Sequence, residues 1–232
     1  MPYADKDDFI VVSVCGTWGR LGVGFNAGRC CGFPKDSTTN DIAFGQWIVQ
    51  NISNMMCVNK EQVFVAGFSN GAFMTEVLSC NASEVFRAGA SVSGIVELRP
   101  GNEGGLDLCD QEYVTHSSAG YVTSILNVHG TWDPFVPWPG DPVLGFPSVP
   151  ENMQRWYDRN KCTGNYTVTF ENERYSNELW SNCSAETQVE LVIHYKGTHE
   201  WPEDQYFNTT DYIMGFFYRN GMNSNTPRQL LL

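Results

Sequence analysis

The stretch QVFVAGFSNGAFMTEVLS, residues 62–79, contains an apolar β-branched run, a glycine-bounded turn and a helical pattern, in that order. Its centre, GFSNG (67–71), fits G-x-S-x-G, in which two glycines allow close packing around a strained strand-to-helix turn. Such a turn pushes the hydroxyl of Ser69 clear of the backbone. The bare pattern is weak evidence, and the alternative is a glycine-rich turn with an incidental serine. The strand pattern before it and the helix pattern after it favour a nucleophilic serine.

Strand and helix patterns alternate along the rest of the chain. We expect strands at 9–14, 62–67, 88–94, 124–130 and 189–195, and helices from Asp41, over 72–79, at 151–160 and at 211–219. Asp41 suits an N-cap or first-turn acid, and the segments 95–123 and 134–150 have loop composition. The alternation predicts an α/β fold with a mostly parallel sheet, as a single domain over 1–232.

Four histidines are candidates for the base that would activate Ser69. His194 lies inside a strand pattern and His129 near the end of another, so both favour a structural role. His116 precedes the strand that would supply the acid, which is the wrong chain order for this motif. His199 follows a strand and lies in a loop, as expected when the order is Ser, acid, His. We therefore predict His199 as the base.

The acid should follow a strand that comes after the serine. Asp133 lies just past the run 124–130, where its carboxylate would hold the Nδ1 proton of His199 and stabilise the imidazolium. Asp141, in a Pro/Gly-rich loop, is the fallback. The other interpretation of Asp133 is a cap on the turn before Pro134.

An acyl-transfer site also needs donors that face the developing oxyanion. The backbone N–H of Asn70, directly after the serine, would be one. The second ordinarily comes from a His-Gly loop after an earlier strand, and no residue before Ser69 offers it. Trp132, Trp138 and Trp201 flank the predicted acid and base and could hold a sugar or phenolic ring, with ordinary packing as the alternative.

The charge balance excludes some classes of partner. Lys+Arg 14 against Asp+Glu 26 gives a net charge of -12, which repels nucleic acid and anionic membrane surfaces. The longest apolar runs are strand-sized, so we expect no membrane span. The predicted chemistry requires no metal and no organic cofactor.

Eight cysteines lack the C-x-x-C spacing of a zinc site, which favours disulfides. A redox role for the vicinal pair Cys30-Cys31 is a weaker alternative, because redox motifs have a two-residue spacer. Both disulfides and glycosylation acceptors are typical of secreted proteins. Such acceptors begin at Asn51, Asn81, Asn165, Asn182 and Asn208.

The first residues, however, have none of the features of a signal peptide. Either the chain is intracellular with free thiols, or its front end is missing. We favour the second interpretation, because intracellular chains seldom hold so many cysteines.

Six segments carry a resemblance to a known family. They are FNAGRCCG (25–32), NDIAF (40–44), VFVAGFSNGAFM (63–74), HGTWDPFVPW (129–138), NKC (160–162) and GTHEWP (197–202). In this order and spacing the chain resembles, over nearly its whole length, the secreted esterases of the α/β-hydrolase fold that include polyhydroxybutyrate depolymerases, feruloyl esterases and the related acetylxylan esterases.

The resemblance implies an α/β-hydrolase fold with Ser69, Asp133 and His199 as a catalytic triad. It also implies four disulfides. The implied pairs are Cys162 with Cys183, Cys80 with Cys109, Cys57 with one of Cys30 and Cys31, and Cys15 with the other.

The chain departs from the family at its front. In the family a strand that ends in His-Gly precedes the segment matching residues 4–14, and it lies beside the strand of the nucleophile. We therefore expect a sheet that lacks its N-terminal strands and a chain that is incomplete relative to the family.

These observations predict a secreted serine carboxylesterase that cleaves esters on a polymer. Feruloyl or acetyl esters of plant cell-wall polysaccharide are slightly favoured over polyhydroxyalkanoate, the substrate of the depolymerases. The alternative from another class is a non-catalytic extracellular module that binds glycan on a hydrolase scaffold. Intact Ser, Asp and His favour the enzyme, and the absent second oxyanion donor favours the module.

Overall fold

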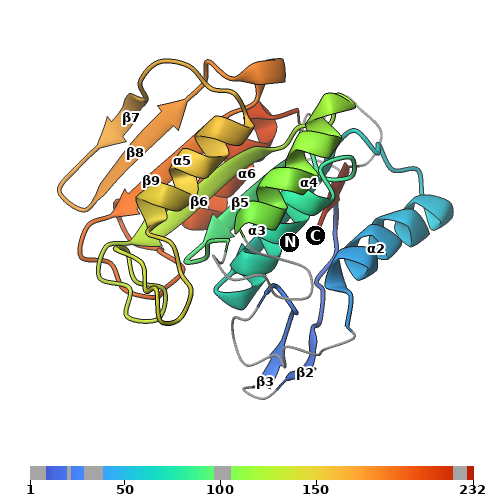
Figure 1. Cartoon of the computed structure of the whole chain (residues 1–232), viewed down its shortest axis with the longest axis horizontal. Coiled ribbons are helices and arrows are strands. Elements are labelled where there is room, and N and C mark those ends of the chain that lie inside the picture. Colours follow the sequence, from blue (N-terminus) through green and yellow to red (C-terminus); the bar gives the residue numbers. More distant parts are fainter. Residues whose placement is uncertain (1–8, 20–21, 29–38, 97–105, 222–228) are drawn as a thin grey trace.

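The fold is built on one eight-stranded sheet, shown in Figure 1 for a computed structural model that describes residues 9–19, 22–28, 39–96, 106–221 and 229–232. The strand order is β1-β10-β4-β5-β6-β9-β8-β7. The parallel strands are β1 (Phe9–Val11), β10 (Gln229–Leu231), β4 (Val63–Phe68), β5 (Ala88–Val92), β6 (Ser124–Gly130) and β9 (Val189–His194). The antiparallel strands β8 (Tyr175–Trp180) and β7 (Thr167–Glu171) complete one edge. The mostly parallel α/β fold agrees with the prediction.

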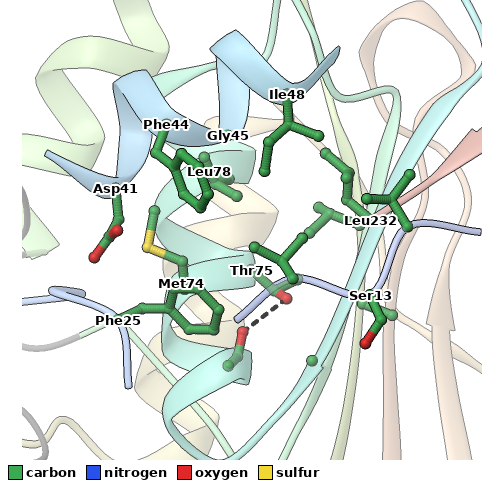
Figure 2. A pocket seen from close by; sticks show the side chains of 16 residues that line it. Ser13, Phe25, Asp41, Phe44, Gly45, Ile48, Met74, Thr75, Leu78 and Leu232 are labelled. Atoms are coloured by element: carbon green, nitrogen blue, oxygen red, sulfur yellow. Dashed lines mark hydrogen bonds between the residues drawn. The ribbon is translucent and has the colours of Figure 1, made fainter. Parts of the chain in front are cut away.

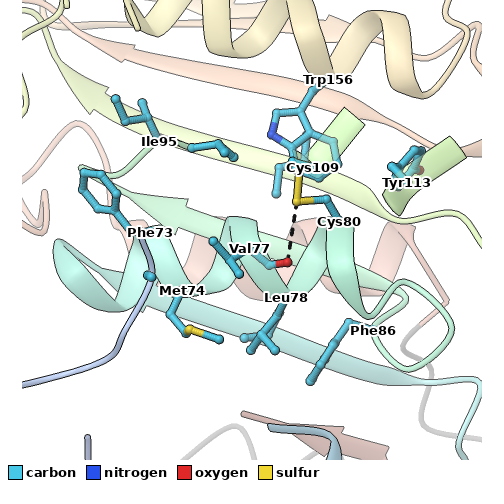
Figure 3. Packing of buried hydrophobic residues seen from close by; sticks show 14 of the residues in the cluster. Phe73, Met74, Val77, Leu78, Cys80, Phe86, Ile95, Cys109, Tyr113 and Trp156 are labelled. Atoms are coloured by element: carbon cyan, nitrogen blue, oxygen red, sulfur yellow. Dashed lines mark hydrogen bonds between the residues drawn. A yellow bond between two sulfur atoms is a disulfide. The ribbon is translucent and has the colours of Figure 1, made fainter. Parts of the chain in front are cut away.

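Helices cover both faces of the sheet (Figure 1). One apolar cluster holds buried side chains of α2 (Asp41–Met55), α3 (Asn70–Asn81), α4 (Leu106–Ser118) and α5 (Val149–Arg159). Figure 3 shows α3 contributing much of this cluster. A second cluster packs α6 (Thr209–Arg219) against the sheet. Smaller elements are the antiparallel pair β2 (Thr17–Gly19) and β3 (Gly22–Gly24) and the 3-10 turn η2 (Ser184–Glu186).

The predicted helices form, and their caps and buried residues are now defined. Asn40 rather than Asp41 caps α2, accepting the backbone N–H of Ala43 at 2.6 Å, and Asp41 lies in the first turn. Phe44 and Met55 are exposed, and α2 packs on the core through Gly45, Ile48 and Val49. In α6 the side chains of Ile213, Phe216 and Phe217 are buried.

The expected loop at 95–123 was wrong in part, because α4 spans Leu106–Ser118. The helix has a largely polar sequence, and tertiary contacts anchor it through buried Tyr113 and through a disulfide from Cys109 to α3. The hairpin β7–β8 was also missed, since the side chains of β7 are mostly exposed and show no apolar run. The first predicted strand is shorter than expected and ends at Val11.

The position next to β4 is filled by the C-terminal strand. β10 lies between β1 and β4, with Leu230 opposite Val63 and Leu231 opposite Phe64. The Leu232 N–H donates to the Phe64 carbonyl at 2.9 Å. β10 thus occupies the place that the family resemblance assigns to a strand upstream of residue 9, an arrangement that the sequence patterns did not predict.

A buried carboxylate ties α3 to the elements around it. Glu76 is fully buried and accepts hydrogen bonds from Asn127 of β6 at 2.9 Å and from Asn152 and Trp156 of α5 at 2.8 and 2.9 Å. Burial raises the pKa of Glu76, and these hydrogen bonds oppose the shift. The network holds the helix that begins at the site against the centre of the sheet.

Candidate active site

The site begins at the turn between β4 and α3. Ser69 has φ 54° and ψ -120°, a conformation that costs a non-glycine residue free energy and that neighbouring packing must enforce. The Ser69 N–H donates to the Val92 carbonyl at 2.9 Å. A Cβ on Gly67 would lie 2.2 Å from the Gly71 carbonyl oxygen, so the turn can close this tightly only with glycine there. The sequence motif therefore folds as the strand-turn-helix that it predicts.

Ser69, His199 and Asp133 form a continuous hydrogen-bonded row. The Oγ of Ser69 is 2.8 Å from Nε2 of His199, and Nδ1 of His199 is 2.8 Å from Oδ2 of Asp133. They follow β4, β9 and β6, so the carboxyl ends of three parallel strands bring them together. The side chain of Asp133 is 0% exposed and that of His199 is 13% exposed.

Both oxygens of the Asp133 carboxylate form hydrogen bonds. Its Oδ1 accepts the backbone N–H groups of Phe135 and Val136, each at 2.9 Å, while Oδ2 faces His199. Burial alone would raise the pKa of Asp133, but these hydrogen bonds outweigh burial and hold the pKa below its usual value. The group is therefore an anion that is positioned to orient an imidazole.

Two phenylalanines that the sequence analysis did not single out lie against the imidazole. The ring centres of Phe68 and Phe135 are 5.0 and 5.2 Å from that of His199, and the side chains are 38% and 67% exposed. Their positions in the chain were a usable signal, because Phe68 directly precedes Ser69 and Phe135 follows Asp133 by two residues. They give the site an accessible apolar rim.

The three tryptophans predicted as substrate contacts have different environments. Trp132 is 64% exposed, with Nζ of Lys196 5.8 Å from the ring centre. Trp138 is half-buried, and its ring centre lies 6.2 Å from that of His129 in an edge-to-face arrangement. Trp201 packs against the α6 cluster and donates its Nε1–H to Thr210 at 3.3 Å. Contact with substrate stays a prediction for all three, and Trp132 presents the most accessible ring.

The other candidate bases and the fallback acid lie outside the Ser69–His199–Asp133 row. His129 and His194 are buried at the ends of β6 and β9, and His116 pairs with Glu84 at 3.0 Å. The Oδ1 of Asp141 accepts the backbone N–H groups of the two residues Val143 and Leu144. The fallback acid therefore stabilises its own loop.

Asn70 connects the turn to the chain that follows β3. Its Oδ1 accepts the Phe25 N–H at 2.6 Å, and its Nδ2 donates to the Phe25 carbonyl at 3.0 Å. As the first residue of α3, Asn70 also has a backbone N–H that no carbonyl within the helix can accept. The predicted oxyanion role of that N–H remains a prediction.

An apolar cavity of about 280 Å³ lies on the α2 side of the turn (Figure 2). Gly67 and Gly71 form part of its wall, while Ser69, Asp133 and His199 are not among the residues that line it. Among the residues drawn in Figure 2 are Phe25, Phe44, Met74, Leu78 and Leu232.

Two of the four implied disulfides are present. Cys80 is bonded to Cys109, and Cys162 to Cys183. The structure corrects the other two pairings, because Cys15 and Cys57 are exposed free thiols. Their implied partners, Cys30 and Cys31, lie outside the described residues, as does any redox role of that vicinal pair.

The predicted glycosylation acceptors remain predictions. Asn165 and Asn182 are exposed around the Cys162–Cys183 disulfide. The other three lie in or beside helices and use their side chains locally: Asn51 in α2, Asn81 in α3 and Asn208 as the N-cap of α6.

Neither membrane helices nor metal clusters are found in the described part of the chain. None of the helices there is long and apolar enough to cross a bilayer. No group of three or more His, Cys, Asp or Glu side chains there could hold a metal ion.

The fold is that of an α/β-hydrolase, and comparison with known proteins supports this class. The acetyl xylan esterase from Aspergillus awamori superposes with a TM-score of 0.54 at 16% identity, over 78% of this chain and 68% of that one. At this identity the match concerns the fold alone. The chain matches no protein-family model.

Sequence comparison confirms the resemblance to the esterase family. The chain is 26% identical over 195 residues to feruloyl esterase B of Piromyces equi, covering 84% of this chain and 34% of that protein. It is 30% identical over 139 residues to a probable feruloyl esterase C of Aspergillus niger, covering 60% and 41% respectively. The chain thus spans between a third and somewhat over two fifths of the length of these curated relatives.

Proposed function

We propose that this chain is a serine carboxylic-ester hydrolase that acts on feruloyl or acetyl esters of plant cell-wall polysaccharide. The observation that carries the proposal is the row from Ser69 through His199 to Asp133, with both contacts at 2.8 Å. The similarity to feruloyl esterases and the fold shared with an acetyl xylan esterase support the ester class.

The geometry supports a two-step acyl transfer. Nε2 of His199 would take the proton of Ser69 as Oγ attacks the ester carbonyl, and would return it to the departing alcohol. Water would then attack the acyl-enzyme, with His199 again as base, and release the acid. Asp133 would stabilise the imidazolium, and the Asn70 N–H would donate to the oxyanion, where one such donor is worth roughly 2.7 to 4 kcal/mol.

A covalent serine probe tests the proposal directly. A fluorophosphonate should label the folded 232-residue chain at Ser69. Labelling should disappear in Ser69→Ala and persist in the control Ser13→Ala, which changes an exposed serine away from the row. A folded chain that neither reacts with the probe nor hydrolyses any ester would overturn the proposal.

Turnover on a substrate panel would define the ester. Methyl ferulate and acetylated xylan should be hydrolysed, and polyhydroxybutyrate tests the depolymerase alternative. Secretion is part of the proposal, supported by the two disulfides and the five acceptor sequences. A loss of apparent mass on treatment with a peptide N-glycosidase, for the chain made in a eukaryotic secretory host, would support it.

One observation favours the non-catalytic glycan-binding module. β10 occupies the place beside β4 where the family has the strand that leads to the second oxyanion donor. A chain of this kind would bind cell-wall oligosaccharides but show no turnover on any ester of the panel. Isothermal calorimetry with xylo-oligosaccharides, beside the hydrolysis assay, separates the two functions.

A further inference from the structure

His129 and Asp133 both form hydrogen bonds with the backbone of Val136. It is the penultimate residue of β6, and its side chain is 0% exposed. Its Nε2 lies 2.8 Å from the Val136 carbonyl oxygen, while the Val136 N–H donates to Oδ1 of Asp133 at 2.9 Å. Val136 is therefore held through both of its backbone groups, once by His129 and once by Asp133.

The contact with the Val136 carbonyl defines which nitrogen of the His129 imidazole carries a proton. A carbonyl can only accept, so Nε2 of His129 carries the proton. Nδ1 is buried and has no hydrogen-bond partner among the described residues. Burial lowers the pKa of His129, which favours the neutral ring, and Nε2 also lies 3.7 Å from Oδ2 of Asp133. The ring presents an N–H to the turn without adding a charge next to the carboxylate.

From this geometry we propose that His129 is a positioning residue: by fixing Val136 it keeps the Asp133 carboxylate turned toward His199. Without the Nε2–H, the buried carbonyl of Val136 loses its donor, which costs free energy unless the turn moves. A turn that moves carries the Val136 N–H away from Oδ1. The adjacent Phe135 ring, packed on the imidazole of His199, would shift with it. The catalytic consequence of the inference rests on the proposed function.

Three substitutions separate positioning from mere packing. Gln can place an amide N–H where Nε2 of His129 lies, Asn is too short to do so, and Leu fills the space without a donor. His129→Leu and His129→Asn should lower kcat about 10- to 100-fold with little change in KM, because small displacements of a catalytic group cost rates of this order. His129→Gln should restore most of the rate. The control His116→Gln changes a histidine outside the row and should leave kcat unchanged.

A spectroscopic readout keeps the test independent of turnover. The proton between His199 and Asp133 should give a downfield proton resonance in the wild type and in His129→Gln, and this resonance should shift or vanish in folded His129→Leu. In the wild type, nitrogen-15 spectra should show His129 as the neutral Nε2–H form.

Two results would overturn the inference whatever the activity. One is an unmoved resonance in folded His129→Leu, and the other is an Nδ1–H form of His129 in the wild type. A wild-type chain that has the resonance but hydrolyses no ester would refute the proposed function alone.

Discussion

The two sides of β4 are built differently. On one side, called the long-strand side here, β4, β5, β6 and β9 are paired over five or six residues per strand pair. On the other side, called the β10 side, β10 pairs with β4 at two positions and with β1 at three. All three members of the Ser69–His199–Asp133 row follow strands of the long-strand side, β4 included. The candidate site therefore depends on the part of the sheet whose strand pairing is most extensive.

The packing of side chains against the sheet also differs between the two sides. On the long-strand side the buried carboxylate of Glu76 meets three donors from β6 and α5. On the β10 side the cavity of about 280 Å³ lies between α2, α3 and Leu232. A cavity leaves the atoms that line it with fewer contacts, so that side should open at lower free energy. Substitutions on the two sides should therefore have different consequences.

The largest expected effect comes from the acid on the long-strand side. Asp133→Asn should lower kcat about 10,000-fold, because the neutral amide no longer fixes the tautomer of His199 or stabilises its cation. Initial rates on a soluble ester measure it. A loss of less than tenfold would show that the row is not the catalytic one.

Asp133→Asn should also change how the free energy of unfolding depends on pH. The folded-state pKa of Asp133 is depressed, so its stabilising contribution is present above the unfolded pKa and is lost as pH falls through the folded one. Urea unfolding of wild type and Asp133→Asn should therefore converge in acid and diverge toward neutral pH. Curves that stay parallel throughout would contradict the ionised, hydrogen-bonded carboxylate.

The next effect is on stability. Glu76→Ala removes the acceptor of three buried hydrogen bonds, although Nδ2 of Asn127 keeps the Gly94 carbonyl at 2.7 Å. It should lower the free energy of unfolding by about 3 kcal/mol or more, while Glu76→Gln, which keeps one acceptor oxygen, should cost less. Denaturant titration measures both. Because the folded-state pKa of Glu76 is raised, the contribution of Glu76 to the free energy of unfolding is full below the unfolded-state pKa and is lost as pH rises through the folded-state pKa. Glu76→Gln should therefore make the free energy of unfolding depend less on pH.

A smaller effect is expected on the β10 side. Leu232→Pro removes the N–H that donates to the Phe64 carbonyl and should cost about 1 to 2 kcal/mol, whereas Leu232→Ala keeps the hydrogen bond and reports the side chain alone. Fluorophosphonate labelling of Ser69 should proceed at the wild-type rate in both folded variants. Slower labelling in Leu232→Pro would show that β10 also supports the candidate site.

The smallest effect concerns an exposed ion pair on the long-strand side. Arg155→Ala removes a contact with Asp110 in which the two side chains are 39% and 28% exposed, and it should change stability by less than about 0.5 kcal/mol. Arg159→Ala removes a contact of the same length to Asp110 from a side chain that is 2% exposed, and should cost more. Equal effects in thermal unfolding would show that burial does not set the strength of these pairs.

Much of the long-strand side was predictable. Its strands are short runs of mostly apolar or β-branched residues, and Ser69, Asp133 and His199 lie in the turns and loops that follow three of them, so local patterns locate both. The β10 side was less predictable, because a three-residue strand carries no periodicity and its partners β1 and β4 lie far from it in the sequence. α4 was missed for a related reason, since a disulfide and buried Tyr113 rather than an apolar stripe hold it in place.

Local sequence patterns specified the strand-turn-helix at Ser69, the order of Ser69, Asp133 and His199 along the chain, and the class of fold. These depend on residue types at short spacing, which sterics and burial translate directly into local structure. Tertiary packing alone brings His129 and Asp133 to the same residue Val136, places Phe68 and Phe135 beside the imidazole, and pairs β10 with β1 and β4. Those relations join residues that have no fixed spacing, so they exist only once the strands are packed side by side.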